Sequence, residues 1–514
     1  MQLTYFSSLL AAALCLALAS GALATTYYLD PSGGDDANAG DSPAEAWQSL
    51  DRVNAFTFQP GDRMLFRNGG LWHGQLWPKG SGSEANPIVI GSYGPGEARP
   101  VIAGEGRAFE AVRLYNQQQW EITGLEVTNH SPEGRAPRAG VRVLGEDAGV
   151  LSHIHLRDLV VHDVNGHFRE GRDGGKCNAG ILFDVIGSQV PTRFDDVLIE
   201  GCRVYQCDRS GIKTWSDWHR WHKQGWAPYT RLVIRGNVLD DIGGDGIVAC
   251  IATAPLIEHN TASRCNARSG DHNVAIWVWE TDDAVIQFNE AYLTRTTNDG
   301  QGFDIDGMTR RTLLQYNYSH DNEGGFVLLC ETGHPSPGFF NDGSVVRYNI
   351  SQNDRARIFQ IGGKVTNASI YNNTVYIGEG QGDPVVVWHN QDGVWPRGVR
   401  YANNIIYNLG AGGYDLGQRE DVVFDHNCFF GRHAESEPQD AHKLTCDPRL
   451  VNPGTGGLGR DSVAGYRLQP DSPCIDTGVL MSDHGGRDYW GNPVASGAAP
   501  DRGAHEFRKE EAKR

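Results

Sequence analysis

A short motif of the form apolar-x-x-Asn-x-apolar recurs through the second half of this 514-residue sequence. Its asparagines follow one another at intervals of 23 to 32 residues, and three degenerate earlier copies place Gly124, Asp158 and Cys202 at the same point. The asparagines are Asn237, Asn260, Asn289, Asn317, Asn349, Asn373, Asn404 and Asn427. A period of this length is typical of solenoids, in which each repeat forms one coil that stacks on the next.

The repeat predicts an all-β fold, a right-handed parallel β-helix in which every coil contributes two or three short strands. The asparagines would stack in one turn, where their amides bond to each other and to backbone groups that the bend leaves unpaired. A composition with 65 Gly, 13 Trp and only 4 Met suits short strands and tight turns better than long helices. One amphipathic helix is predicted at 43–58, with Trp47, Leu50, Val53 and Phe56 on one face, and it would cap the N-terminal end.

The ends of the chain differ in composition from the repeat region. Residues 1–24 carry no charged side chain and contain a long apolar run that ends in small residues, which is typical of a secretory signal. We expect residues 25–507 to form a single β-helix domain and residues 508–514 to be a disordered charged tail. The mature protein is thus predicted to be secreted or periplasmic and monomeric. Nine cysteines follow the signal, an odd count that predicts one or two local disulfides beside buried thiols.

The charge of the chain restricts its partners. A formal net charge of -18 argues against nucleic acid and anionic membranes, because both bind basic surfaces. After the signal, no stretch of the sequence is apolar and long enough to span a bilayer. A polysaccharide remains compatible with this charge, even an anionic one, since bound cations or a local basic cluster can invert the field.

Several motifs together resemble one known superfamily. They are PGDRMLFRNGG near the N-terminus, the asparagine coils, and SPCIDTG and PDRGAHE near the C-terminus. In these features the mature chain resembles, over essentially its whole length, secreted bacterial right-handed β-helix proteins of the pectate-lyase-like superfamily. The resemblance implies the fold, but the superfamily includes polysaccharide lyases, glycoside hydrolases, epimerases and adhesins, so it leaves the activity open.

Three short runs alternate in the way that is typical of strands, and they predict one solvent-exposed face of the solenoid. The runs are residues 275–279, 302–306 and 325–329. In a strand, successive side chains point to opposite faces, so inward Ile276, Ile305 and Leu328 would leave alternate residues facing solvent. The outward residues would be Trp277, Trp279, Asp304 and Asp306, with Val327 and Leu329 next in the same columns. Two tryptophans and two carboxylates would then share one surface patch.

The two aspartates indicate a hydrolase. Asp304 and Asp306 would lie two residues apart on one face, with about 6.5–7 Å between their Cα atoms. This separation is compatible with an inverting glycosidase, in which one carboxyl group protonates the leaving oxygen and the other activates water. Crowding also raises the pKa of one carboxyl group, as a general acid requires. Glu280 is a candidate third carboxylate, together with Asp299 and Asp245.

A lysine supports a different chemistry, calcium-assisted β-elimination. Lys213 is the only cation in the outward columns, and a lysine can take the C5 proton of a uronic acid while calcium neutralises the substrate carboxylate. The resemblance implies such a role, because lyases of the superfamily often use a β-helix lysine. The acidic turn that contains Asp240, Asp241 and Asp245 resembles the calcium-binding turns of some of these lyases. The alternative to a catalytic role for Lys213 is a simple ion pair with Asp184.

Aromatic residues predict where a sugar chain would bind. The loop 215–226 contains four tryptophans in twelve residues, and exposed aromatic rings stack on the apolar faces of sugar rings. We therefore expect Trp215 and Trp218 to bind substrate together with the tryptophans of the 275–279 run. Arg357 and His389 flank the same face, and Arg357 could orient a carboxylate or sulfate group. A third hypothesis is that the chain is a carbohydrate-binding or adhesin solenoid that has this groove and catalyses no reaction.

Overall fold

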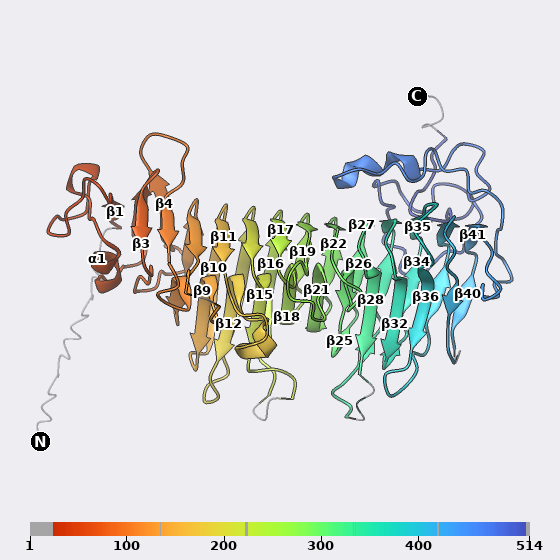
Figure 1. The fold of residues 1–514 in the computed structure, drawn as a ribbon, viewed down its shortest axis with the longest axis horizontal. Helices are drawn as coiled ribbons and strands as arrows, with labels where there is room; N and C mark the ends of the chain where they lie inside the picture. Colours follow the sequence, from red (N-terminus) through yellow and green to blue (C-terminus); the bar gives the residue numbers. More distant parts are fainter. Residues whose placement is uncertain are drawn as a thin grey trace, which may run out of the picture.

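The computed structural model describes residues 24–509 except 134, 222–224, 333, 335, 419 and 420. Within these residues the chain winds into one elongated solenoid of parallel strands (Figure 1). This confirms the predicted all-β, right-handed parallel β-helix. The expected signal and most of the expected tail lie outside the described residues, so both stay predictions. Among the residues described, no helix combines the length and apolar character needed to cross a bilayer.

The strands of successive coils pair in parallel and form three ladders. The first ladder contains β6 (Glu110–Tyr115), β9 (Ala139–Glu146), β12 (Ala179–Ile186), β15 (Ser210–Ser216), β18 (Ile247–Thr253), β21 (Ile276–Asp282), β24 (Gln301–Ile305), β28 (Gly325–Glu331), β32 (Arg357–Gly363), β36 (Val385–Asn390) and β39 (Tyr414–Asp415). The second contains β1 (Thr26–Leu29), β2 (Arg63–Arg67), β4 (Ile88–Tyr93), β7 (Trp120–Thr123), β10 (Val150–Arg157), β13 (Arg193–Glu200), β16 (Tyr229–Arg235), β19 (Leu256–Glu258), β22 (Val285–Gln287), β26 (Leu313–Gln315), β30 (Val345–Arg347), β34 (Ser369–Tyr371), β37 (Arg400–Ala402) and β40 (Val423–Asp425).

The third ladder forms a separate sheet of thirteen strands. It contains β3 (Leu71–His73), β5 (Val101–Ala103), β8 (Glu126–Asn129), β11 (Val160–Val164), β14 (Arg203–Cys207), β17 (Val238–Ile242), β20 (Thr261–Ser263), β23 (Glu290–Tyr292), β27 (Tyr318–His320), β31 (Ile350–Gln352), β35 (Thr374–Ile377), β38 (Ile405–Asn408) and β41 (Cys428–Gly431). Three two-residue strands lie between the first and second ladders, namely β25 (Thr309–Arg310), β29 (Asn341–Asp342) and β33 (Val365–Thr366).

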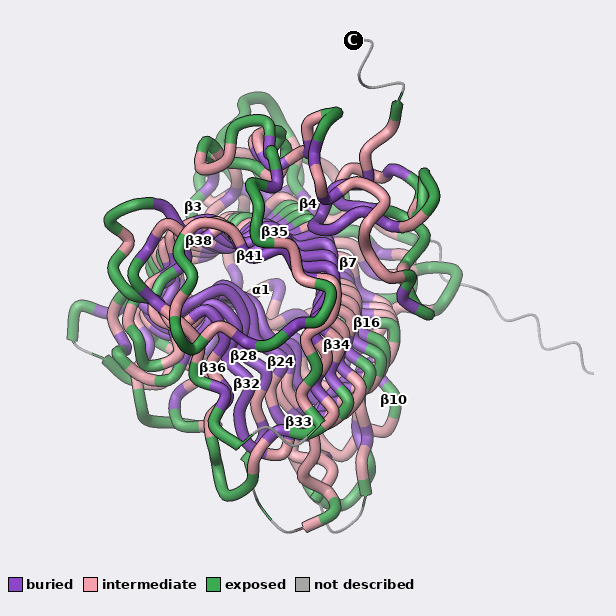
Figure 2. Tube along the Cα trace, turned by 90° about the vertical axis from the view of Figure 1, so that its right-hand side faces the viewer, coloured by how far each residue is buried: buried purple, intermediate pink, exposed green. Residues whose placement is uncertain are grey.

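Inward side chains of the three ladders form one continuous core along the solenoid axis. In Figure 2, which views the molecule along this axis, buried residues follow the inner side of the coils. One column of the first ladder shows the principle, because its residues pair in register and are at most 1% exposed: Ile247, Ile276, Phe303, Val327 and Phe359. Burial of each such side chain contributes roughly 1.5–3 kcal/mol.

The predicted asparagine stack forms between the second and third ladders. Asn260 is typical, because its backbone N–H and its Nδ2 both donate to Asn289 Oδ1, at 2.9 and 3.0 Å, and Nδ2 also donates to the carbonyl of Ile234. At the first end of the stack the backbone of Cys202 donates to Asn237, as the sequence predicts.

The predicted register is wrong at the two earliest copies. Gly124 and Asp158 adopt positive φ, 72° and 51°, like the residue that precedes each stacked asparagine. Leu125 and Leu159 therefore occupy the equivalent positions, one residue later. A sequence pattern without asparagine does not distinguish these two neighbouring turn positions.

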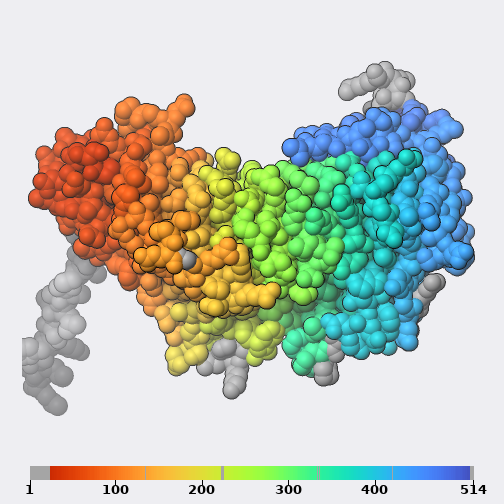
Figure 3. All heavy atoms as spheres, in the orientation of Figure 1, coloured from red at the N-terminus to blue at the C-terminus, as the bar shows by residue number. Residues whose placement is uncertain are grey.

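Two irregular segments cover the ends of the solenoid. The predicted helix at 43–58 is replaced by a 3-10 turn, η1 (Pro43–Glu45), and a shorter helix, α1 (Leu50–Ala55), which begins where Ser49 accepts a hydrogen bond from Arg52. The closing segment, residues 432–509 with η3 (Arg460–Tyr466), lies along one side of the last coils (Figures 1 and 3). The nine described cysteines all carry free thiols, contrary to the expected disulfides.

Candidate active site

A pocket of about 330 Å³ lies on the outward side of the first ladder at β18, β21 and β24. Both predicted aspartates and three of the four tryptophans named from the sequence line it. Among the described residues, the lining consists of Asp173, Lys176, Trp215, Asp245, Cys250, Asp271, His272, Asn273, Val274, Trp277, Trp279, Asp299, Asp304 and Asp306. The structure thus places acids and indoles side by side.

Strand register explains why these side chains meet. Trp277 of β21 pairs with Asp304 of β24, while Ile276 and Ile305 point into the core. One coil further, however, Asp304 pairs with Leu328 and not with Val327, so the predicted columns are wrong at β28.

Close backbone packing accounts for the shift at β28. Gly325 pairs with Gln301 and has a φ of 139°, and a Cβ atom there would lie 1.7 Å from the carbonyl oxygen of Arg357. Glycine is therefore required at this position by a close approach of two coils. The Gly-Phe pairs of β24 and β28 look alike in sequence, but they are one residue out of register.

Asp299, Asp304 and Asp306 form a carboxylate cluster in the pocket. Asp304 is only 4% exposed, and burial followed by the charges of Asp306 and Asp299 raises its pKa well above the usual value. Burial also raises the pKa of Asp306 and of Asp299. Crowded acids share their protons unequally, because ionising one of them makes it harder to ionise its neighbours, so such a cluster favours one protonated and one ionised member.

Local hydrogen bonds distinguish the members of the cluster. Asp306 Oδ1 accepts from the backbone N–H of Gly307 at 2.6 Å and from the thiol of Cys330 at 3.2 Å, which favours its ionised form. Asp304 Oδ1 is buried and has no hydrogen-bond partner among the described residues. The proton is therefore held more readily by Asp304 than by Asp306.

An aromatic wall borders the carboxylates. The rings of Trp215 and Trp279 stack in parallel with 5.4 Å between centroids, and Trp221 contacts Trp279 edge-on at 5.4 Å. Trp221 is 48% exposed and stacks on Phe339. Trp218, in contrast, is fully buried, so its predicted role as a sugar contact is wrong. Four tryptophans in a loop have no periodicity that separates buried from exposed rings.

Glu280 holds this loop and does not line the pocket. The side chain is fully buried, and its carboxylate accepts a hydrogen bond from the backbone N–H of Arg220. Burial raises the pKa of Glu280 to about 8. The Arg220 guanidinium pairs with Asp282 at 2.6 Å, so Arg220 joins the tryptophan loop to β21 through its backbone and its side chain. The structure therefore does not support the predicted catalytic role of Glu280, which instead anchors the tryptophan loop.

Lys213 is a buried cation behind the pocket. Its Nζ pairs with Asp173 at 2.8 Å and not with Asp184, which instead pairs with Arg142. Burial alone would lower the pKa of Lys213, but the Asp173 carboxylate raises it above the usual lysine value. A lysine held protonated in this way is unsuited to remove a proton, so the structure contradicts the base expected for β-elimination.

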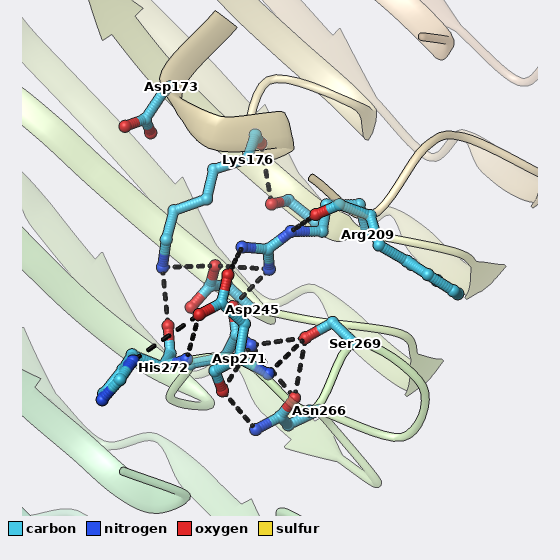
Figure 4. A network of polar contacts seen from close by, with 12 residues as sticks. Asp173, Lys176, Arg209, Asp245, Asn266, Ser269, Asp271 and His272 are labelled. Atoms are coloured by element: carbon cyan, nitrogen blue, oxygen red, sulfur yellow. Dashed lines mark hydrogen bonds and ion pairs between the residues drawn. The ribbon is translucent and has the colours of Figure 1, made fainter. Parts of the chain in front are cut away.

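A polar network forms part of the pocket lining, and Figure 4 shows its contacts. At its centre the buried Asp245 accepts from Lys176 at 3.0 Å, from Arg209 at 3.2 Å and from the indole Nε1 of Trp277 at 2.9 Å. Burial alone would raise the pKa of Asp245. The positive charges of Lys176 and Arg209 outweigh this effect and bring the pKa below its usual value. Asp245 therefore stays ionised and fixes the ring of Trp277. The irregular loops that supply Lys176, Asp271 and His272 carry no motif that predicts a site.

The calcium turn expected near Asp245 does not form. Asp240 pairs with Arg264, and Asp241 pairs with Arg268 at 2.5 Å, so neither carboxylate converges with Asp245. Within the described residues, the three aspartates thus provide no common cation site.

Arg357 and His389 also lie outside the pocket lining. The Arg357 guanidinium donates to the carbonyl oxygens of Thr297 and Asp299, at 2.6 and 3.1 Å, and thereby supports the loop that carries Asp299. His389 is 1% exposed and its Nε2 lies 2.9 Å from Tyr401 Oη. Burial lowers the pKa of His389 to about 4, so it is a neutral interior residue and the prediction of substrate contact is wrong.

Comparisons with known proteins agree with this fold. No protein-family model matches the sequence. A lacto-N-biosidase of Bifidobacterium longum subsp. longum is 26% identical over an alignment of 604 positions that covers 94% of this chain. The present chain spans only 36% of the length of that relative.

Two solved structures of a GH136 lacto-N-biosidase from Eubacterium ramulus are also similar. The selenomethionine derivative is 25% identical with a TM-score of 0.62, covering 79% of this chain and 67% of the other. The native protein is 26% identical with a TM-score of 0.61, covering 76% and 68%.

Proposed function

We propose that this protein is a glycoside hydrolase that cleaves a glycan bound in the pocket of the first ladder. The observation that carries the proposal is the cluster of Asp299, Asp304 and Asp306 beside the aromatic wall. Carboxyl groups with separated protonation states supply acid and base, while indole rings bind the apolar faces of sugars. The similarity to lacto-N-biosidases supports the same reaction class.

Within the cluster, the burial and hydrogen bonds of each aspartate indicate which one acts as acid and which as base. Asp304 has the least solvent-exposed side chain of the three acids and serves as the protonated group that donates to the leaving oxygen. Asp306 accepts two hydrogen bonds and serves as the ionised carboxylate. It acts either as the nucleophile that attacks the anomeric carbon or as the base that activates water. Asp299 lies beside both and raises the pKa of Asp304.

The spacing of the pair bears on stereochemistry. One oxygen of Asp304 lies within 4.8 Å of one oxygen of Asp306. Inverting enzymes hold their carboxyl groups about 6.5–9.5 Å apart, and retaining ones about 5–5.5 Å apart. This spacing favours retention of anomeric configuration over the inversion expected from the sequence.

Calcium-assisted elimination has less support. Lys213 is paired and buried, and among the described residues the pocket lining contains six aspartates against one lysine, Lys176. A uronate substrate would add another negative charge to this surface, where like charges repel. A binding protein without turnover would not require three crowded acids with raised pKa values.

The test compares purified wild type with Asp304→Asn, Asp306→Asn and Asp299→Asn on a glycan panel that includes a lacto-N-biose glycoside. New reducing ends without unsaturated products are expected for wild type. Asp304→Asn and Asp306→Asn should each lower kcat by about 100-fold or more, since general acid–base groups contribute about 10²- to 10⁴-fold. Asp240→Asn, which alters an aspartate paired with Arg264 outside the pocket, should retain wild-type rates.

The same experiment separates the alternatives. Products that absorb in the ultraviolet and activity that chelation abolishes would support the lyase, and glycan binding without any product would support the adhesin. Near-normal rates in both Asp304→Asn and Asp306→Asn would remove these aspartates from the mechanism.

A further inference from the structure

A second constellation of ligating side chains lies at the C-terminal end of the solenoid, away from the pocket. Asp425 ends β40, His426 follows it in the turn, and His442 comes from the closing segment. The Nδ1 atoms of His426 and His442 lie 2.7 and 3.0 Å from the same oxygen, Asp425 Oδ1. The two imidazole rings stack with 4.3 Å between centroids. One carboxylate and two imidazoles from different segments therefore converge.

The surrounding backbone fixes both histidines in this arrangement. Asp440 Oδ1 accepts from the backbone N–H groups of His426 and His442, at 3.1 and 2.9 Å. Asp440 Oδ2 accepts from Asn427 and terminates the asparagine stack. Arg502 also donates to the carbonyl oxygen of His442 at 2.9 Å. The ligands are thus held by the main chain, independently of the contact between their side chains.

We propose that Asp425, His426 and His442 bind one divalent transition-metal ion such as zinc. One potential ligand atom from each residue lies within 4.8 Å of those of the other two. Ligands around zinc stand about 2.0–2.2 Å from the metal, so the nitrogens must separate from the oxygen only slightly to admit the ion. Imidazole and a single carboxylate suit zinc, copper or nickel, whereas calcium requires 6–8 oxygen ligands.

The charges around the three ligands and their exposure to solvent also suit a bound metal ion. Both Nδ1 atoms face the carboxylate oxygen, and an ion bound there would take the place of the Nδ1 hydrogens, each of which shifts to Nε2 of its ring or leaves to solvent. Arg400 donates to the other oxygen, Asp425 Oδ2, at 2.9 Å and would orient the carboxylate from outside the site. The side chain of His442 is 61% exposed, which leaves an open path for the ion and a position for bound water.

The site would join the closing segment to the last coil. Asp425 and His426 belong to the coil, whereas His442 belongs to the segment that covers it. Because a metal that binds only the folded state stabilises it by mass action, loading should raise the melting temperature. No part of this proposal depends on the glycosidase reaction.

The experiment uses untagged, chelator-treated full chain titrated with zinc chloride by calorimetry and followed by thermal unfolding. One ion should bind per chain at micromolar or lower Kd and raise Tm. His426→Ala and His442→Ala should each weaken binding at least tenfold and remove the Tm increase. His433→Ala is the matched control, because His433 pairs with Glu437 in the same closing segment and lies outside the cluster.

Three outcomes would overturn the proposal: no binding to wild type, equal binding to His426→Ala and His442→Ala, or equal loss in His433→Ala. His442 is exposed, so His442→Gln provides a second variant that is expected to fold normally. Glycan cleavage by that variant should equal that of wild type, which keeps this test separate from the test of the active site.

Discussion

At the residue scale, the acid role proposed for Asp304 conflicts with stability. Its burial beside two other carboxylates raises its pKa in the folded state above the value of about 3.9 that it has when unfolded. The folded state therefore binds the proton more tightly. Between the unfolded and the folded pKa, stability falls as pH rises, because the ionised form is disfavoured in the pocket.

We therefore predict that Asp304→Asn stabilises the protein while it abolishes turnover. The amide carries no charge, so the free energy of unfolding at pH 7 should rise, because the variant avoids the cost of an ionised carboxyl group in the pocket. The dependence of stability on pH between 4 and 7 should also become flatter. Urea unfolding of wild type and variant across this range measures both effects.

Asp283→Asn is a control of opposite sign. The hydrogen bond from Arg311 lowers the pKa of the Asp283 carboxyl group, so its ionised form is favoured in the folded state. That variant should be no more stable than wild type at pH 7. If Asp304→Asn were destabilising while Asp283→Asn behaved as expected, the folded pKa of Asp304 would not be raised.

At the element scale, the sequence predicts regular coils well and their exceptions poorly. The asparagine stack follows from the repeat, because each Asn meets the same unpaired backbone groups. The register of β28 does not follow, because it depends on the close contact between Gly325 and Arg357 in the next coil. The partner of Lys213 is Asp173 of an irregular loop, and no pattern in the sequence indicates that contact.

The stack itself gives a graded prediction. Asn317→Ala removes the acceptor for the backbone N–H and Nδ2 of Asn289, and it removes the donor to the carbonyl of Ile286. Three buried polar groups lose partners, so unfolding should become easier by about 3 kcal/mol or more, at about 1–3 kcal/mol per group.

The end of the stack supplies the comparison. Asn237→Ala leaves the backbone N–H of Cys202 and the carbonyl of Ile199 without these partners, two groups instead of three. It should therefore destabilise less than Asn317→Ala in the same thermal or urea unfolding assay. Equal losses at the two positions would mean that the contacts between asparagines contribute little beyond the local turn.

At the scale of the whole molecule, each coil contacts mainly its neighbours, so stability is distributed along the axis. The pocket lies on the middle coils, whereas the closing segment protects the last ones. Local opening near the end should therefore leave the pocket intact. Nothing in the repeat predicts which residue joins the closing segment to the last coil, because the contact spans 75 residues from Asn427 to Arg502.

Arg502→Ala tests this view of the molecule. The buried guanidinium donates to the carbonyl oxygens of Asn427, His442 and Thr477, and the variant leaves all three without that donor. Hydrogen exchange should become faster in β38 and β41, while exchange in β21 and β24 and glycan cleavage stay unchanged, because opening free energies differ between regions. Arg432→Ala, at an exposed position just after β41, should alter none of these rates. Uniformly faster exchange in β21 and β41 would instead mean that the solenoid opens as one cooperative unit, and the pocket would then depend on its distant cap.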